Sequence, residues 1–288
     1  MPEEVAPLRA CLVGARRLPV RSGACGGEIV LGQLHGVSVA LAVTGDGARN
    51  AREGIAALLG HVQVERLIAL GVAGALSRDL IEGALVVAEQ VMLEGGGPGT
   101  TLRADEALVA VAARATGARR GVVMTAGRIA DTVAEKQRLL GLVAPAETAP
   151  PSAGLGDAVA VTASSGASAV VDLESAGYIG AAVRAGIPWV VLRAVSDTAD
   201  EALPALLNRS RDEGGAVRRG SVVRGLLGDP GVLPALLGLR RRVQLGAGVL
   251  SRATAALLTA PAPGRGSSSP AKHGEAGEPA LGSPGGMT

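Results

Sequence analysis

The chain has 288 residues, of which 48% are hydrophobic and 19% charged, with a formal net charge of +2. This predicts one or two globular domains with a large core, and it argues against a nucleic-acid-binding surface. Three histidines and two cysteines disfavour a histidine-based metal site and a disulfide framework. An acidic start, and no uncharged apolar run of membrane length, predict a cytoplasmic protein without a signal peptide.

The first half of the chain predicts a hairpin followed by strands that alternate with helices. We expect strands at 8–14, 28–34, 37–43, 66–70, 84–92 and 121–125, and helices at 49–59 and 105–116. Thr132–Glu135 forms a capping box that begins another helix. This order is typical of a three-layer α/β sandwich with a mixed central sheet.

Two segments have the composition of irregular chain. Residues 143–166 are rich in Ala, Pro, Gly and Ser and predict a long loop insertion. Residues 261–288 predict a disordered tail. The domain itself is therefore expected to span residues 1–260.

The middle of the second half predicts a strand, a helix and a second strand. Residues 167–171 are apolar, 175–185 are small or good helix formers, and 189–195 form an apolar run. Gly186 stands where a glycine commonly ends a helix. Arg193 interrupts the last run, so a buried strand here requires a carboxylate partner.

Carboxylates follow both of these strands. Asp172 and Glu174 come at the end of the first, and Asp197 and Asp200 at the end of the second. Ligands of open α/β sheets bind at the carboxyl ends of strands. The sequence therefore predicts that both acidic clusters face one pocket.

Two glycine-rich segments follow predicted strands. Thr44–Gly47 matches half of a dinucleotide-binding fingerprint, but Asn50 stands where its third glycine belongs. This junction is either an anion-binding loop or a tight turn. Gly71–Ala75 allows either a ligand close to the backbone or close packing of other elements.

The motifs together resemble a known superfamily. They are GxG after the third strand, Gly71–Leu76, Asp172–Ser175 and Arg193–Asp200. Their order resembles that of the purine nucleoside phosphorylase and methylthioadenosine/adenosylhomocysteine nucleosidase superfamily, over residues 8–257. Thr132–Lys136 and the sequence GDPGVLPALLGLRRR make the chain most similar to the hopanoid-associated phosphorylase branch.

The resemblance implies cleavage of the N-glycosidic bond of a purine nucleoside. Asp197 would protonate or hydrogen-bond N7 of the base, Glu174 would bind the ribose hydroxyls, and Leu173 would pack on the sugar. Ser196 and Arg193 would hold Asp197 and neighbouring groups in place. The further candidate substrate-binding residues are Asp172, Gly71, Ala73, Gly74 and Ile129.

One departure from the nucleosidases favours phosphorolysis. Nucleosidases of this superfamily carry a water-activating glutamate just after the first strand, where this chain reads Gly14–Ala15–Arg16–Arg17. A cation is a poor general base but suits an incoming phosphate. We therefore expect inorganic phosphate as co-substrate and no cofactor, although Val72 replaces the phosphate-binding serine of many phosphorylases. The expected phosphate-binding residues are Gly45, Gly47, Arg16 and Arg17.

Two alternatives remain open: a nucleosidase that uses water, and a non-catalytic nucleoside-binding protein. The hopanoid-associated branch implies a lipid-linked substrate, adenosylhopane, from which adenine would leave. Residues 236–258 are helical and studded with arginine, so they either pack on the body or contact a membrane surface peripherally. The resemblance also implies a homo-oligomer.

Each candidate residue also has a structural interpretation. Glu174 and Asp197 could cap the segments that follow them, and Asp200 is expected to do so. Arg193 could form a structural ion pair. Tyr178 and Trp189 are expected to belong to the core.

Overall fold

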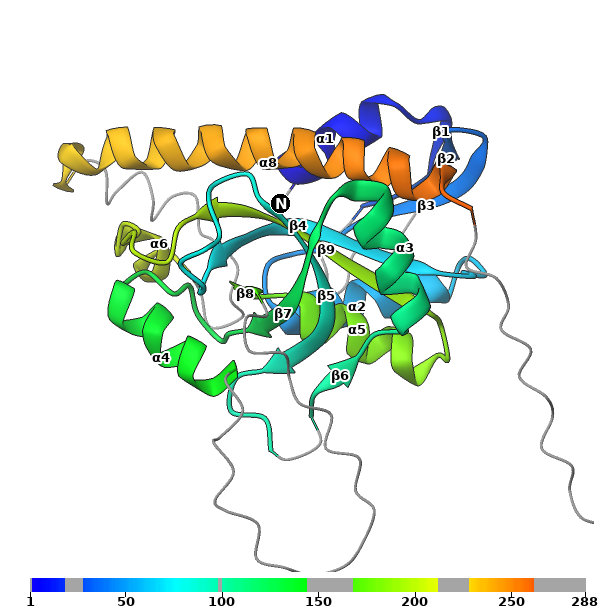
Figure 1. Ribbon diagram of the computed structural model, residues 1–288. Helices are drawn as coiled ribbons and strands as arrows, with labels where there is room; N and C mark the ends of the chain where they lie inside the picture. Colours follow the sequence, from blue (N-terminus) through cyan, green and yellow to red (C-terminus); the bar gives the residue numbers. More distant parts are fainter. Residues whose placement is uncertain (1, 19–27, 98–99, 144–167, 212–227, 262–288) are drawn as a thin grey trace, which may run out of the picture.

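The computed structural model describes residues 2–18, 28–97, 100–143, 168–211 and 228–261. It shows the mixed α/β fold that the sequence predicts, with helices packed around a mixed central sheet (Figure 1). The predicted loop insertion, apart from Val143, lies outside the described residues. So does the predicted tail, apart from Pro261.

The helices are α1 (Pro2–Ala10), α2 (Ala48–Leu59), α3 (Glu106–Thr116), α4 (Val133–Val143), α5 (Ser175–Arg184), α6 (Leu206–Arg209), the 3-10 helix η1 (Pro230–Val232) and α8 (Leu233–Thr259). The strands are β1 (Val13–Leu18), β2 (Glu28–Leu34), β3 (Val37–Val43), β4 (Leu67–Ala75), β5 (Leu85–Leu93), β6 (Leu102–Arg103), β7 (Arg119–Thr125), β8 (Ser168–Asp172) and β9 (Trp189–Asp197).

The large sheet has the strand order β6-β5-β7-β8-β4-β9, and a further pairing of β5 with β9 closes it on itself. Strand β4 runs parallel to β9 and antiparallel to β8. Every residue of β8 and β9 is buried, as expected of strands covered on both faces. Strands β1, β2 and β3 form a separate antiparallel sheet.

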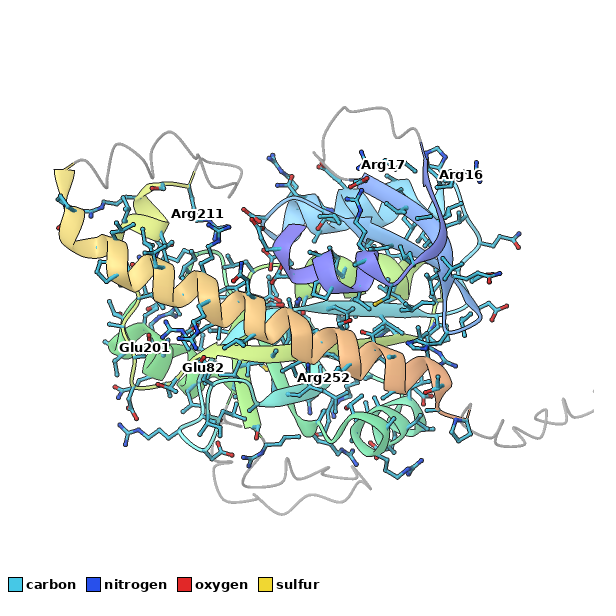
Figure 2. All side chains as sticks on the ribbon, turned by 90° about the horizontal axis from the view of Figure 1, so that it is seen from above. Arg16, Arg17, Glu82, Glu201, Arg211 and Arg252 are labelled. Atoms are coloured by element: carbon cyan, nitrogen blue, oxygen red, sulfur yellow. The ribbon has the colours of Figure 1, made fainter. Side chains whose placement is uncertain are left out.

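The start of the chain differs from the prediction. A strand was expected at 8–14, but helix α1 runs to Ala10 and β1 begins at Val13. Acidic residues in the first turn of α1 and Arg9 in its last turn complement the helix dipole. Arg9 also pairs with Glu28 of β2 at 2.6 Å. Helix α1 lies beside α8 and over β4 (Figures 1 and 2).

Strand β4 is longer than predicted and includes the glycine-rich segment. A Cβ atom on Gly71 would lie 1.9 Å from Nη1 of Arg193, and one on Gly74 would lie 2.8 Å from Oδ2 of Asp197. Close packing is therefore observed at both glycines, and Gly74 also lines a pocket. The glycines make room for side chains of the neighbouring strand β9.

The predicted C-terminal helix is confirmed as α8, which packs on the body of the protein. Its buried residues include Val243, Ala247, Leu250 and Leu257, whose spacing places them on one face. Gly246 lets the helix approach β4, because a Cβ there would lie 2.9 Å from Val72. Within the described residues, none of the helices has both the length and the apolar character that a membrane crossing requires.

Candidate active site

One pocket opens where β8 and β9 end, beside the centre of β4. Most of the predicted site residues line it: Gly45, Ala73, Gly74, Ile129, Asp172, Leu173, Glu174, Arg193, Ser196 and Asp197. The prediction that the acidic ends of two strands meet at one pocket is therefore correct for Asp172, Glu174 and Asp197. Asp200 instead pairs with Arg78 at 3.1 Å on the surface.

Asp197 is the last residue of β9 and is 3% exposed. Ser196 Oγ donates a hydrogen bond of 2.6 Å to its Oδ1, and Lys136 Nζ donates one of 2.6 Å to its Oδ2. Gly74 leaves space beside this carboxylate. Its side chain is thus held by two donors, and it caps no helix.

Asp172 and Arg193 form a buried ion pair with an oxygen–nitrogen distance of 2.5 Å. Asp172 also accepts hydrogen bonds from Thr125 Oγ1 and from the backbone N–H of Ser175, the first residue of helix α5. Burial lowers the pKa of Arg193, but the carboxylates of Asp172 and Glu174 outweigh this and raise it. Arg193 therefore combines the structural ion pair with a place in the pocket wall.

Glu174 follows β8 and makes no capping hydrogen bond with α5. Burial, with a smaller contribution from Asp172, raises the pKa of Glu174 to about 7, although Arg193 opposes this shift. The backbone N–H of Gly47 donates to Glu174 Oε1 at 3.0 Å. The predicted anion-binding junction before α2 thus binds a carboxylate of the protein itself.

The close approach of α2 and α5 allows the hydrogen bond between Gly47 and Glu174 to form. A Cβ on Gly177 of α5 would lie 2.1 Å from the carbonyl oxygen of Ala48, at the start of α2. Only glycine allows the two helices to meet there. Their contact brings the first N–H groups of α2 to the end of β8.

Glu4 of α1 also lines the pocket, which no pattern in the sequence indicates. Its Oε1 accepts a hydrogen bond of 2.9 Å from the backbone N–H of Val72, in β4. An acid in the first turn of a helix is commonly explained by the helix dipole, which hides any other role. In addition, the sequence predicted a strand at 8–14 and no helix before it, so residues 2–10 were not expected to reach the site.

The predicted phosphate-binding set does not assemble. Arg16 and Arg17 are exposed residues of β1, and Arg17 pairs with Glu28 at 2.5 Å. Figure 2 places both arginines at the opposite end of the molecule from Arg211, which lines the pocket. Of the predicted set, only Gly45 lines the pocket.

The pocket lining also includes residues that the sequence did not point to as site residues. Tyr178, expected in the core, packs against it but also lines the pocket and shares a 2.7 Å hydrogen bond with Thr44. Trp189 is buried in the core as predicted. Further lining residues are Asp46, Arg128, Leu203, Leu207, Arg211, Leu239 and Val243. No cluster of three or more His, Cys, Asp or Glu that could hold a metal ion occurs in the described part of the chain.

Comparisons with known proteins agree with this architecture. A 5'-methylthioadenosine/S-adenosylhomocysteine nucleosidase of Geobacillus kaustophilus is 31% identical over 216 residues, which span 70% of this chain and 83% of the relative. One from Marinomonas sp. is 28% identical over 220 residues, spanning 71% and 85%.

Solved structures show the same fold. The nucleosidase of S. pneumoniae with a transition-state inhibitor matches with a TM-score of 0.64 at 18% identity, covering 90% of this chain and 96% of the other. The futalosine hydrolase of Helicobacter pylori matches with a TM-score of 0.63 at 18% identity, covering 90% and 94%. The family model described as "Phosphorylase superfamily" matches residues 1–226. The chain belongs to the phosphorylase superfamily.

Proposed function

We propose that the protein cleaves the N-glycosidic bond of a purine nucleoside, with water as the acceptor. The observation that carries this proposal is the convergence of Asp197 and Glu174, from two strand ends, on one pocket. The two curated relatives described above are named as nucleosidases that act on adenine nucleosides, which supports the same class of reaction.

The proposed roles follow from the charges that develop during cleavage. When the bond breaks, its electron pair goes to the base, and positive charge develops on the ribose. Asp197 serves the base as proton donor, and Glu174 serves the ribose as an anion that binds its hydroxyl groups. Preorganised groups at both ends lower the barrier more than either does alone.

The charge around the pocket favours water over phosphate. Among its described lining residues, five carry carboxylates and three carry guanidinium groups, and one of the latter, Arg193, is already paired with Asp172. Arg16 and Arg17, on which the expectation of phosphorolysis depended, lie elsewhere. Glu4 is a carboxylate of the kind that can accept a proton from attacking water. Glu4 would therefore activate the water, a role for which the segment Gly14–Arg17 contains no acidic residue.

Apolar residues line another part of the pocket and bear on the 5′ substituent of the nucleoside. They come from the segment around α6 and from the first half of α8: Leu203, Leu207, Leu239 and Val243. We propose that they accommodate an apolar 5′ group. The largest such group considered is the hopane of adenosylhopane, the substrate implied by the hopanoid-associated branch.

A lipid-linked substrate would require contact with a bilayer. Leu233, Leu237 and Leu245 of α8 are exposed, at 44%, 55% and 54%, and would supply the apolar part of such a contact. Co-sedimentation with vesicles, with and without anionic lipid, tests this. Absence of binding to both would remove the membrane contact. Homo-oligomerisation also stays a prediction, to be measured by light scattering.

The reaction is tested by adenine release from a set of 5′-substituted adenosines, with and without inorganic phosphate. We expect equal release in both buffers and a free sugar as product. Reaction in ¹⁸O-labelled water should then place the label at the anomeric carbon. Release that requires phosphate and gives a sugar phosphate would contradict the choice of acceptor. Binding without any release would favour a nucleoside-binding protein.

A further inference from the structure

Lys136 of α4 is fully buried next to Asp197. Its side chain is 1% exposed, and its Nζ donates to Asp197 Oδ2 at 2.6 Å. The same Nζ donates to the carbonyl oxygens of Thr198 at 2.6 Å and Glu201 at 2.9 Å. Burying an ammonium group is costly unless it is paired and hydrogen-bonded, and three acceptors meet this requirement.

Other charged groups near this pair already have partners of their own or lie in the pocket wall. The carboxylate of Glu201 turns to Arg242, at 2.7 Å, and Asp172 pairs with Arg193. The remaining charged residues of the pocket lining are Glu4, Asp46, Arg128, Glu174 and Arg211. Lys136 is not part of that lining, so it contacts the pocket through Asp197.

The hydrogen bonds indicate where the transferable proton is stored. Lys136 forms an ion pair with Oδ2 of Asp197 at 2.6 Å. The single proton of Ser196 Oγ has two acceptors, Oδ1 of Asp197 at 2.6 Å and the Ala73 carbonyl at 3.3 Å, and the first is the closer. The Asp197 side chain therefore stands in the arrangement of a carboxylate. Of the two donors in contact with Asp197, the ammonium group of Lys136 is far more acidic than the hydroxyl of Ser196, so it is the one that can release a proton.

We propose that Lys136 supplies, through Asp197, the proton that the departing base takes up; this rests on the proposed function. The Nζ–H bond breaks as a proton moves to Oδ2, and that proton then moves to the base as the glycosidic electron pair arrives there. The base leaves neutral, Asp197 is again a carboxylate, and Lys136 is left as a neutral amine that solvent reprotonates after release.

Lys136 also ties α4 to the chain after β9, so the test must separate proton supply from structural support. The variants are Lys136→Met, which removes the ammonium, and Lys136→Arg, which keeps a cation that does not release its proton. Arg138→Met is the matched control, because it removes an exposed cation from the same helix. Each is assayed on an adenine nucleoside and on a 4-nitrophenyl riboside with the same 5′ group, whose leaving group needs no proton.

We expect both Lys136 variants to lower kcat/KM for the adenine nucleoside by about 100-fold or more, the usual contribution of a positioned proton donor. Their activity on the nitrophenyl riboside should be preserved. In Lys136→Met the basic limb of the pH profile should move to lower pH, because a lone carboxyl group loses its proton at lower pH than an ammonium group does. Arg138→Met should change neither substrate's rate nor the profile.

Three results would overturn the inference: equal losses on both substrates, an unmoved basic limb in Lys136→Met, or full rescue by Lys136→Arg. Each is what a structural role predicts. If Lys136→Met does not fold, the comparison of substrates in Lys136→Arg decides. A wild-type protein that does not cleave the adenine nucleoside would contradict the proposed function itself. In a protein that does cleave it, any of the three results above would contradict the proton supply alone.

Discussion

The ends of β8 and β9 both present carboxylates to the pocket, but they differ in how their charge is balanced. At the end of β9, Asp197 is in direct contact with the ammonium group of Lys136. At the end of β8, the carboxylates of Asp172 and Glu174 share one cation, Arg193. One end is neutralised and carries a transferable proton. The other keeps an excess of negative charge.

This difference suits the proposed reaction, in which negative charge develops on the base and positive charge on the ribose. The pair of Asp197 and Lys136, which is neutral overall and carries a proton, suits the base. The carboxylates of Asp172 and Glu174, which share one cation, suit the ribose. The unbalanced end is held at an energetic cost, since burial and its neighbour Asp172 raise the pKa of Glu174 to about 7. Substitutions at each strand end test this difference separately.

The largest effect is expected at the β9 end. Replacing Asp197 with asparagine should lower kcat by about 1000-fold or more, since it removes the group that reaches the base. Nucleoside affinity, measured by calorimetry, should change little. Asp200→Asn is the matched control, because Asp200 lies in the same segment but pairs with Arg78 on the surface. Full turnover by Asp197→Asn would contradict the role of this residue.

The next effect concerns the supply of water. We expect Glu4→Gln to lower kcat by about 100-fold, because the amide keeps the acceptor for the Val72 N–H but cannot take a proton from water. The neighbouring Glu3 is exposed, so Glu3→Gln serves as control. Equal rates in the two variants would show that Glu4 does not act on water.

A third prediction concerns stability at the β8 end. The pKa of Glu174 is raised from its ordinary 4.5 to about 7, so the folded state binds more protons than the unfolded state between these values. The stabilisation that Glu174 contributes therefore falls as pH rises through this window. Relative to wild type, Glu174→Gln should gain on the order of 2 kcal/mol in free energy of unfolding between pH 5 and pH 8.

Urea unfolding at the two pH values measures this gain. Glu135→Gln is a useful contrast, because its hydrogen bond with Arg138 lowers the pKa of Glu135. The contribution of Glu135 therefore changes only below its unfolded pKa, and this variant should show almost no gain between pH 5 and pH 8. A gain of the same sign and size in both variants would show that the effect does not come from the site.

The smallest effect is expected at the exposed arginines of β1. Replacing both Arg16 and Arg17 with alanine should leave adenine release, and its independence of phosphate, unchanged, because neither lines the pocket. Chromatography of the products with and without phosphate checks this. A loss of phosphate-stimulated turnover in the double variant would restore the original expectation of phosphorolysis.

Local sequence patterns predicted the centre of the site well. The strand, helix and strand from β8 to β9 match the expected bounds closely, and Gly186 adopts the positive φ, 66°, that was expected of a glycine after a helix. The buried partner required by Arg193 is Asp172, as its position in an apolar strand implied. The strand predicted at 8–14 was wrong for a different reason: an apolar run bounded by charged residues is compatible with the end of a helix as well as with a short strand.

The strands, the helix between them and the carboxylates at the strand ends can be predicted from the sequence, because they depend on residues close together in the chain. The group that each carboxylate faces cannot be predicted in this way, because it comes from a distant part of the chain. Lys136 meets Asp197 across 61 residues, Gly47 meets Glu174 across 127, and Glu4 meets Val72 across 68. Periodicity shows which residues share a face of one element. The balance of charge in a pocket depends on contacts between elements, which close sheet packing brings together.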